Sequence, residues 1–97
     1  MPFEWDEDKN RRNIAKHGIS FPQAARIFAG FTFSRVDDRF DYGEVREISI
    51  GSVDGAAVLV VVHTDRNGVC RLISARQARR SERERYDQEL RAAVDPG

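Results

Sequence analysis

The sequence has few of the residues that build disulfides, metal centres or cofactor sites. Cys70 is its only cysteine, so no disulfide within the chain and no cysteine cluster are expected. His17 and His63 are far apart and have no companion at the spacing of a metal motif. We therefore expect no metal and no cofactor, and we interpret Cys70 as packing in the core of a protein from a reducing compartment.

Long apolar runs are missing as well. The mean hydropathy is negative, and no stretch is long and apolar enough to cross a membrane. The first residues, MPFEWDEDK, are acidic and lack the apolar segment of a secretion signal or the basic character of a transit peptide. These absences predict a cytoplasmic protein that does not contact membranes.

Lysine is scarce, and arginine takes its place. Only Lys9 and Lys16 accompany fourteen arginines, and the 16 basic residues balance 16 acidic ones. Six of the arginines lie in RLISARQARRSERERY, residues 71–86. The planar guanidinium group suits forked recognition of phosphates or carboxylates, so this composition favours an anionic ligand.

The length of 97 residues fits one domain that spans 1–97. Asp6 and Gly18 delimit a first helix, and Ser20 and Gly30 delimit a second. A third helix is predicted over 79–93, or from Ser81 with Glu84 as its capping partner. The intervening segments alternate or are strongly apolar, as strands are. We predict an α+β fold with two N-terminal helices, a four-stranded antiparallel meander and a C-terminal helix; its strands are 31–36, 45–51, 56–64 and 69–75.

Two short turn signals, Asp54-Gly55 and Asn67-Gly68, suggest the register of the last three strands. As two-residue hairpin loops they pair Thr64 with Arg71, His63 with Leu72 and Val61 with Ser74. They also pair Ile50 with Leu59, Ile48 with Val61 and Arg46 with His63. This register predicts one core face with Arg46 beside His63 at its rim, made of Ile48, Ile50, Leu59, Val61 and Leu72. The opposite face is expected to be partly covered and to meet a ligand.

Arginines also occupy the side of the last helix that should be buried. Arg79, Arg83, Tyr86 and Leu90 fall on one stripe of this helix. With Arg71 and Arg76, its arginines lie where the last strand meets the helix. Their convergence would suit a phosphate backbone, although a solvated surface is an equally plausible interpretation of the four.

Four segments of the sequence together resemble the BrnT toxin family of small RelE-like proteins, over about residues 3–86. They are residues 3–21, 48–51, 58–64 and 71–86. The closing pattern includes Arg71, Ser74, Arg76 and Tyr86, whereas Arg79 stands where the family usually has Thr or Ser. The opening pattern comprises Phe3, Glu4, Trp5, Asp6, Lys9, Asn13, Lys16, His17, Gly18 and Phe21. The resemblance implies a ribonuclease of a type II toxin-antitoxin pair that cuts RNA and slows translation. It further implies a cognate BrnA-like antitoxin that wraps the toxin and contacts operator DNA.

Metal-free RNA cleavage needs a base, an acid and positive charge at the phosphorus. Our catalytic candidates are His63, Arg71, Arg76 and Tyr86, and our RNA-binding candidates are Arg46, Arg79, Arg83 and Lys16. His63 could instead be a half-buried structural histidine, and Tyr86 could be core. Lys16 and His17 could serve as partners of a helix terminus, and Glu82 reads as a charge at a helix start rather than a base.

Two other functions use the same arginines. A DNA-binding regulator would need a recognition helix that is free of core packing, which Tyr86 and Leu90 argue against. An inactive interaction module would keep only the antitoxin-binding surface. The exposed acidic segment 37–47 and the basic sheet face are both candidates for that surface.

Overall fold

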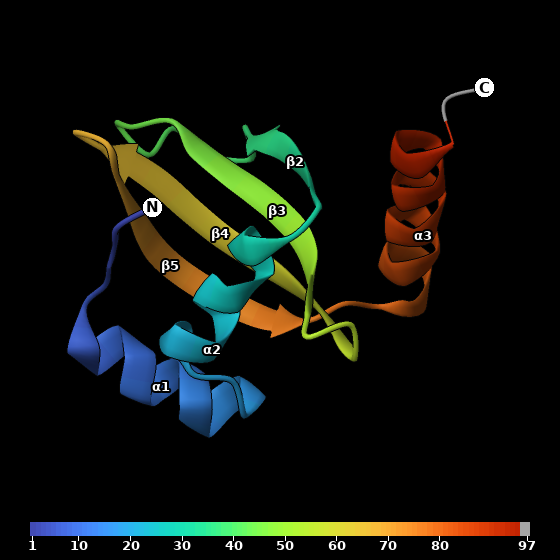
Figure 1. The fold of residues 1–97 in the computed structure, drawn as a ribbon. Coiled ribbons are helices and arrows are strands. Elements are labelled where there is room, and N and C mark those ends of the chain that lie inside the picture. Colours follow the sequence, from blue (N-terminus) through green and yellow to red (C-terminus); the bar gives the residue numbers. More distant parts are fainter. Residues whose placement is uncertain (96–97) are drawn as a thin grey trace.

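The computed structural model describes residues 1–95, and it confirms the α+β class (Figure 1). The sheet has five strands in the order β1-β5-β4-β3-β2 rather than the four predicted. The additional strand, β1, runs parallel to β5, and every other pair is antiparallel. The strands are β1 (Phe3–Glu4), β2 (Thr32–Asp37), β3 (Arg46–Val53), β4 (Ala57–Arg66) and β5 (Val69–Gln77).

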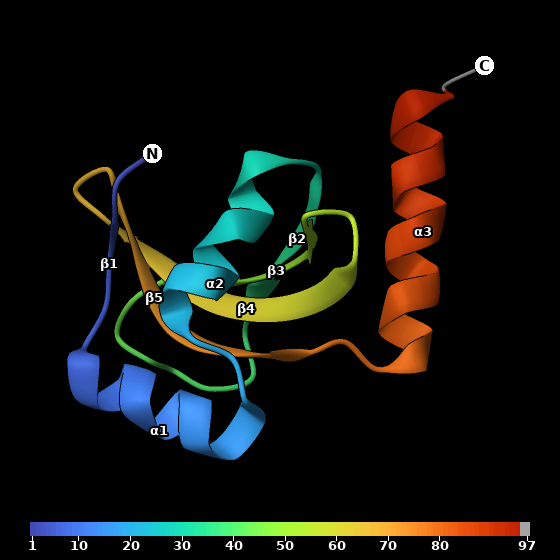
Figure 2. The ribbon, with the colours of Figure 1, turned by 60° about the horizontal axis from the view of Figure 1, so that its bottom comes forward.

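The helices are α1 (Glu7–His17), α2 (Phe21–Ala25) and α3 (Arg80–Val94). A short 3-10 helix, η1 (Arg26–Ala29), continues α2, so the second predicted helix changes its winding halfway. In both views α1 and α2 lie close together while α3 stands apart from them (Figures 1 and 2). No helix in residues 1–95 has the length and apolar character to cross a membrane.

The helix ends follow the capping signals in the sequence. The Asp6 carboxylate accepts hydrogen bonds from the backbone N–H groups of Asp8 and Lys9, and Gly18 ends α1 with a φ of 72°. The Ser20 hydroxyl accepts from the Gln23 N–H at the start of α2. The third helix begins after Arg79, whose N–H donates to Glu82, so a start at Ser81 with Glu84 as partner was wrong.

The predicted register was wrong for β3 and β4. The Ala56 N–H donates to the Val53 carbonyl across a tight turn in which Asp54 and Gly55 both have positive φ. However, Val53 pairs with Ala57 rather than with Ala56, so the loop holds one residue more than a two-residue hairpin. Each β4 residue therefore pairs with a β3 residue one position away from the predicted one.

The hairpin between β4 and β5 was predicted correctly near its turn. Thr64 pairs with Arg71 and His63 with Leu72, as expected. Beyond this point the register shifts between Val62 and His63, so Val61 pairs with Ala75 instead of Ser74. A β-bulge of this kind adds a residue to one strand and leaves no signal in the spacing of the turn.

The single predicted core face is consequently two cores on opposite faces of the sheet. Leu59, Val61 and Leu72 pack against α2 and η1 through Phe21, Ala24 and Ile27. Ile48, Ile50 and Val60 face the other side, where Tyr86 and Leu90 of α3 cover them. Because adjacent residues of a strand point to opposite faces, a shift by one residue placed Ile48 and Ile50 on the face opposite to Leu59.

Close packing of η1 on β3 depends on Gly51. A Cβ atom at this position would lie 2.8 Å from the Cβ of Ile27, which is closer than real Cβ atoms approach one another. Glycine therefore allows the fully buried Ile27 to lie directly on the strand.

Asn13 ties α1 to the sheet edge that the short strand β1 leaves open. Its side-chain amide donates to the carbonyls of Ala75 (2.9 Å) and Ile19 (2.8 Å). Its side-chain carbonyl accepts from the Ala75 N–H at 3.1 Å. The buried amide thus satisfies both backbone groups of Ala75, as a neighbouring strand would.

Replacing Asn13 should therefore destabilise the fold markedly. We expect Asn13→Ala to lower the free energy of unfolding by about 2–3 kcal/mol, because it leaves buried backbone groups without partners. Urea denaturation monitored by circular dichroism measures this value. The control is Arg12→Ala, an exposed change on the same helix that should cost less than about 0.5 kcal/mol. Equal stability of the two variants would refute the role of Asn13.

Candidate functional site

A basic groove lies beside the sheet face that α3 covers in part. It consists of two adjacent pockets, both lined by His17 and Ser74. Ile48, Val60 and Val62 form its apolar floor. The basic residues around this floor come from α1, β2, the segment after β2, and β5: Lys9, Arg12, Lys16, His17, Arg35, Arg39 and Arg76.

On the β5 side of the groove, Arg76 is held by a forked ion pair with Glu82 of α3. Nη1 and Nη2 of Arg76 each donate to one carboxylate oxygen at 2.8 Å. This pair lowers the pKa of Glu82 to about 2 and raises the pKa of Arg76. The Glu82 carboxylate also accepts the Arg79 N–H, so one side chain links the guanidinium to the start of α3.

On the β2 side, Arg39 is held in the same way by Asp37. Nε and Nη2 of Arg39 donate to the two Asp37 oxygens at 2.7 and 2.8 Å. The Tyr42 hydroxyl donates to the same carboxylate at 3.1 Å. The Asp37 side chain is only 1% exposed, and the bonds from Arg39 hold its pKa well below the usual range.

The two held guanidinium groups are near enough to affect each other. The positive charge of Arg39 lowers the pKa of Arg76, although the bond to Glu82 outweighs this effect. Arg35 on β2 pairs with Ile48 of the floor, lines the same pocket as Arg39 and Arg76, and makes no ion pair within residues 1–95. Three arginines therefore surround a small apolar floor, an arrangement that can bind a phosphate diester.

His63, the first catalytic candidate from the sequence, lies on the other face of the sheet. It is buried, its Nε2 lies 2.6 Å from the Ser49 hydroxyl oxygen, and its ring meets the edge of Phe28. Burial lowers the pKa of His63, and the charge of Glu47 opposes this effect. The structure thus places His63 at a separate pocket, which Ser49 and Glu47 also line, and not in the basic groove.

Arg46 is not beside His63, which corrects the predicted pairing. Arg46 pairs with Asp37 in β2, whereas His63 pairs with Glu47. The Arg46 guanidinium lies 4.0 Å from the centre of the Tyr42 ring and bonds to Glu44 at 3.2 Å.

Tyr86 is a core residue of the α3 face. It is 5% exposed, and its hydroxyl donates to the Phe31 carbonyl at 3.2 Å. Its ring lies 5.9 Å from that of Phe31, so both its ring and its hydroxyl have partners.

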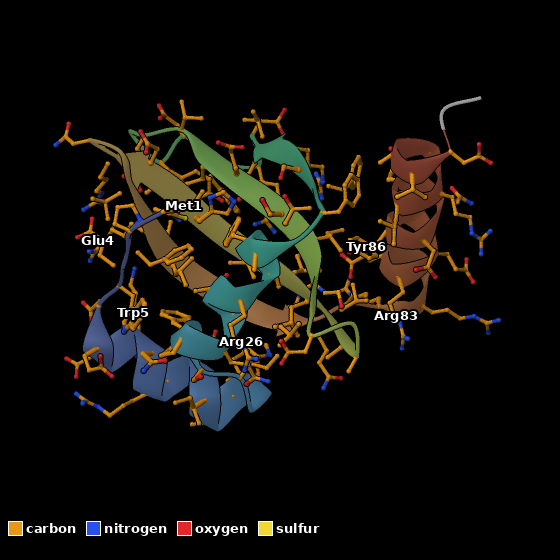
Figure 3. All side chains as sticks on the ribbon, viewed as in Figure 1. Met1, Glu4, Trp5, Arg26, Arg83 and Tyr86 are labelled. Carbon is orange, nitrogen blue, oxygen red and sulfur yellow. The ribbon has the colours of Figure 1, made fainter. Side chains whose placement is uncertain are left out.

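The arginines of residues 71–86 are spread over the molecule. Arg71 lies 3.6 Å from Glu4 at the β1 edge, and Figure 3 shows Glu4 and Arg83 at opposite sides of the molecule. Arg83 lines a separate pocket with Arg26 and Tyr86, and Arg79 caps α3. Of the eight candidates from the sequence, the basic groove contains only Arg76 and Lys16.

Sequence patterns did not identify Arg35 and Arg39 as site residues. Arg35 lies on β2 and Arg39 in the segment that follows it. This segment joins β2 to β3 without a tight-turn signal, so the register of β2 could not be derived. The available signal was Arg35 between Phe33 and Asp37 on one face of a strand, a basic residue on an otherwise packed surface.

Comparisons with known proteins agree on one family. Residues 5–82 match a family model described as the ribonuclease toxin, BrnT, of a type II toxin-antitoxin system. The fold is similar to the 1.1 Å crystal structure of the Brucella abortus ribonuclease toxin BrnT, with a TM-score of 0.62 and 26% identity. That match covers 82% of this chain and 99% of the Brucella chain. No curated protein matches the sequence.

The buried His63 should make the stability of the fold depend on pH. Because its folded pKa lies below the unfolded value of 6.5, acidification protonates the unfolded chain first and lowers the free energy of unfolding. The loss should start near pH 6.5 and should be absent in His63→Gln, as measured by urea unfolding between about pH 7.5 and 5. Carboxylates such as Glu82, with its lowered pKa, lose their contribution below about pH 4.5, outside this window. An unchanged slope in the variant would contradict this assignment.

Proposed function

The chain belongs to the BrnT family of ribonuclease toxins of type II toxin-antitoxin systems, and from this premise we propose that it cuts RNA in the basic groove without a metal ion. The observation that carries the proposal is the arrangement of Arg35, Arg39 and Arg76 around an apolar floor. The floor can accept a ribose or base while the guanidinium groups contact the phosphate. This combination suits a single strand with one phosphate bent into the groove.

In the proposed reaction the 2′-oxygen of one ribose attacks the adjacent phosphorus. The O2′–P bond forms and the P–O5′ bond breaks, which leaves a 2′,3′-cyclic phosphate and a 5′-hydroxyl. A base takes the 2′ proton, an acid protonates the departing 5′-oxygen, and Arg39 and Arg76 stabilise the charge at phosphorus. Arginine provides this stabilisation without a metal ligand set.

His17 is the groove residue best suited to move a proton. Histidine exchanges protons near neutral pH more readily than other side chains, and His17 lines both pockets of the groove. His63 lies on the opposite face, and the Tyr86 hydroxyl is engaged with a backbone carbonyl. The proposal therefore assigns proton transfer to His17 and leaves the structural roles to His63 and Tyr86.

The family description implies an RNA target and an antitoxin partner. We propose that a BrnA-like antitoxin inhibits the toxin by covering the basic groove, that operator DNA is contacted through the antitoxin, and that RNA cleavage slows translation. A partner that presents carboxylates would compete directly with RNA phosphates for Arg35, which has no ion pair within the described residues.

Removing Arg35 tests the groove with little risk to the fold. Arg35→Ala should slow cleavage of a fluorescent single-stranded RNA about 100-fold, because one phosphate donor is lost. EDTA should leave the wild-type rate unchanged. Arg91→Ala, which removes the same charge from the last turn of α3, serves as the control and should retain the rate. Tight binding to duplex DNA with RNA left intact would instead support a DNA-binding regulator.

The two histidines should differ in the pH dependence of cleavage. We expect His17→Gln to lose one limb of the pH–rate profile at saturating RNA and His63→Gln to keep both limbs, since only His17 borders the groove. Initial rates between about pH 5 and 9 measure this difference. The reverse pattern would return proton transfer to His63.

A further inference from the structure

Two carboxylates, Asp37 and Glu82, form ion pairs with the groove arginines Arg39 and Arg76. Neither carboxylate lines the groove itself. Each accepts two hydrogen bonds from one guanidinium, in the forked geometry that fixes both its position and the orientation of its plane. A guanidinium has five N–H donors, so further donors remain for a phosphate after the fork is made. The ion pairs thus orient Arg39 and Arg76 without consuming their capacity to bind a phosphate.

Both carboxylates are themselves fixed by other parts of the fold. The Asp37 side chain is almost completely buried and also accepts from the Tyr42 hydroxyl. Glu82 accepts the Arg79 N–H at the start of α3. These additional bonds prevent the carboxylates from following a guanidinium that swings away.

The need for such anchors follows from the charges in the groove. Arg39 and Arg76 line the same pocket, so their like charges repel each other, and the charge of Arg39 lowers the pKa of Arg76. Without a counterion, two long flexible side chains of like charge would move apart into solvent. RNA would still attract them, but they would meet the phosphate in many orientations.

We propose that Asp37 and Glu82 are positioning residues for RNA cleavage, which hold Arg39 and Arg76 in the orientation that stabilises the phosphorane. This inference rests on the proposed ribonuclease function. Neither carboxylate contacts RNA in this scheme, and neither transfers a proton. Each instead adds a negative charge close to the phosphate-binding surface, which opposes RNA binding while it orients the reacting groups.

The proposal therefore predicts opposite effects on binding and on cleavage. Neutralising either carboxylate removes one negative charge beside the groove, so RNA affinity should stay the same or rise. The rate at saturating RNA should fall about 10- to 100-fold, because a misplaced guanidinium stabilises the reaction poorly. A direct phosphate contact behaves differently, since its loss weakens binding and cleavage together.

The variants are Glu82→Gln and Asp37→Asn, studied in the full chain. Glutamine is accepted at this position of a capping box, so Glu82→Gln keeps the α3 cap. The control is Glu84→Gln, an exposed change on α3 that removes the same charge and lies away from the groove. Thermal unfolding of each variant checks that the groove is folded at the assay temperature.

Two measurements separate positioning from other roles. The dissociation constant is measured with an RNA whose scissile 2′-hydroxyl is replaced by hydrogen, and the rate constant with the intact RNA in single turnover. We expect slower cleavage with unchanged or tighter binding for Glu82→Gln and Asp37→Asn, and wild-type values for Glu84→Gln. The pH–rate profile should keep its shape at a lower height, whereas loss of a limb would make the carboxylate a base.

Several outcomes would overturn the inference. Wild-type rates in both variants, or binding that weakens in step with the rate, would exclude positioning. If both variants give one of these results while Arg35→Ala still slows cleavage about 100-fold, the positioning role fails and the proposed function stands. If the wild-type chain leaves RNA intact, both fail together.

Discussion

The additional residue in the β3–β4 loop decides what each face of the sheet carries. Because Val53 pairs with Ala57, Ile48 and Ile50 share a face with Val60 and Val62. That face then holds the apolar floor of the groove and the surface on which α3 packs. The same shift turns His63 toward Ser49 and Phe28 on the other side. One residue in a loop thus separates the buried histidine from the basic groove.

The sheet alone does not complete the groove. The Arg76–Glu82 pair joins the end of β5 to the first turn of α3, and Glu82 also bonds to the backbone that begins this helix. Tyr86 then fixes the helix against Phe31, one turn further along. The orientation of a groove arginine is therefore coupled to the packing of the last helix. Substitutions of the α3 residues that pack on the sheet should therefore change the orientation of Arg76 through Glu82, although these residues are distant from any bound phosphate.

Much of the fold could be predicted because its signals are local. Asp6, Gly18 and Ser20 delimit helices through hydrogen bonds to residues a few positions away in the sequence. The Asn67-Gly68 turn likewise fixes the pairing of the β4 and β5 residues next to it. The strand Phe3–Glu4 could not be predicted, since two residues show no periodicity and their partner lies far along the chain. The β-bulge near His63 and the loop residue Ala56 shifted the register without any turn signal. The errors in register affected the predicted site more than the predicted fold, because the register decides which face of the sheet each candidate side chain lies on.

The geometry of the groove explains why this chain uses arginine rather than lysine. A net charge of zero gives no general attraction to RNA, so its affinity must come from local arrangement. A guanidinium can offer one edge to a carboxylate and another edge to a ligand, as Arg39 and Arg76 are placed to do. An ammonium group is a point charge that a carboxylate does not orient in a plane. A site whose cationic side chains are held by carboxylates of the same chain therefore needs arginine. A lysine in such an ion pair would lose its net charge, and the carboxylate would not fix its orientation.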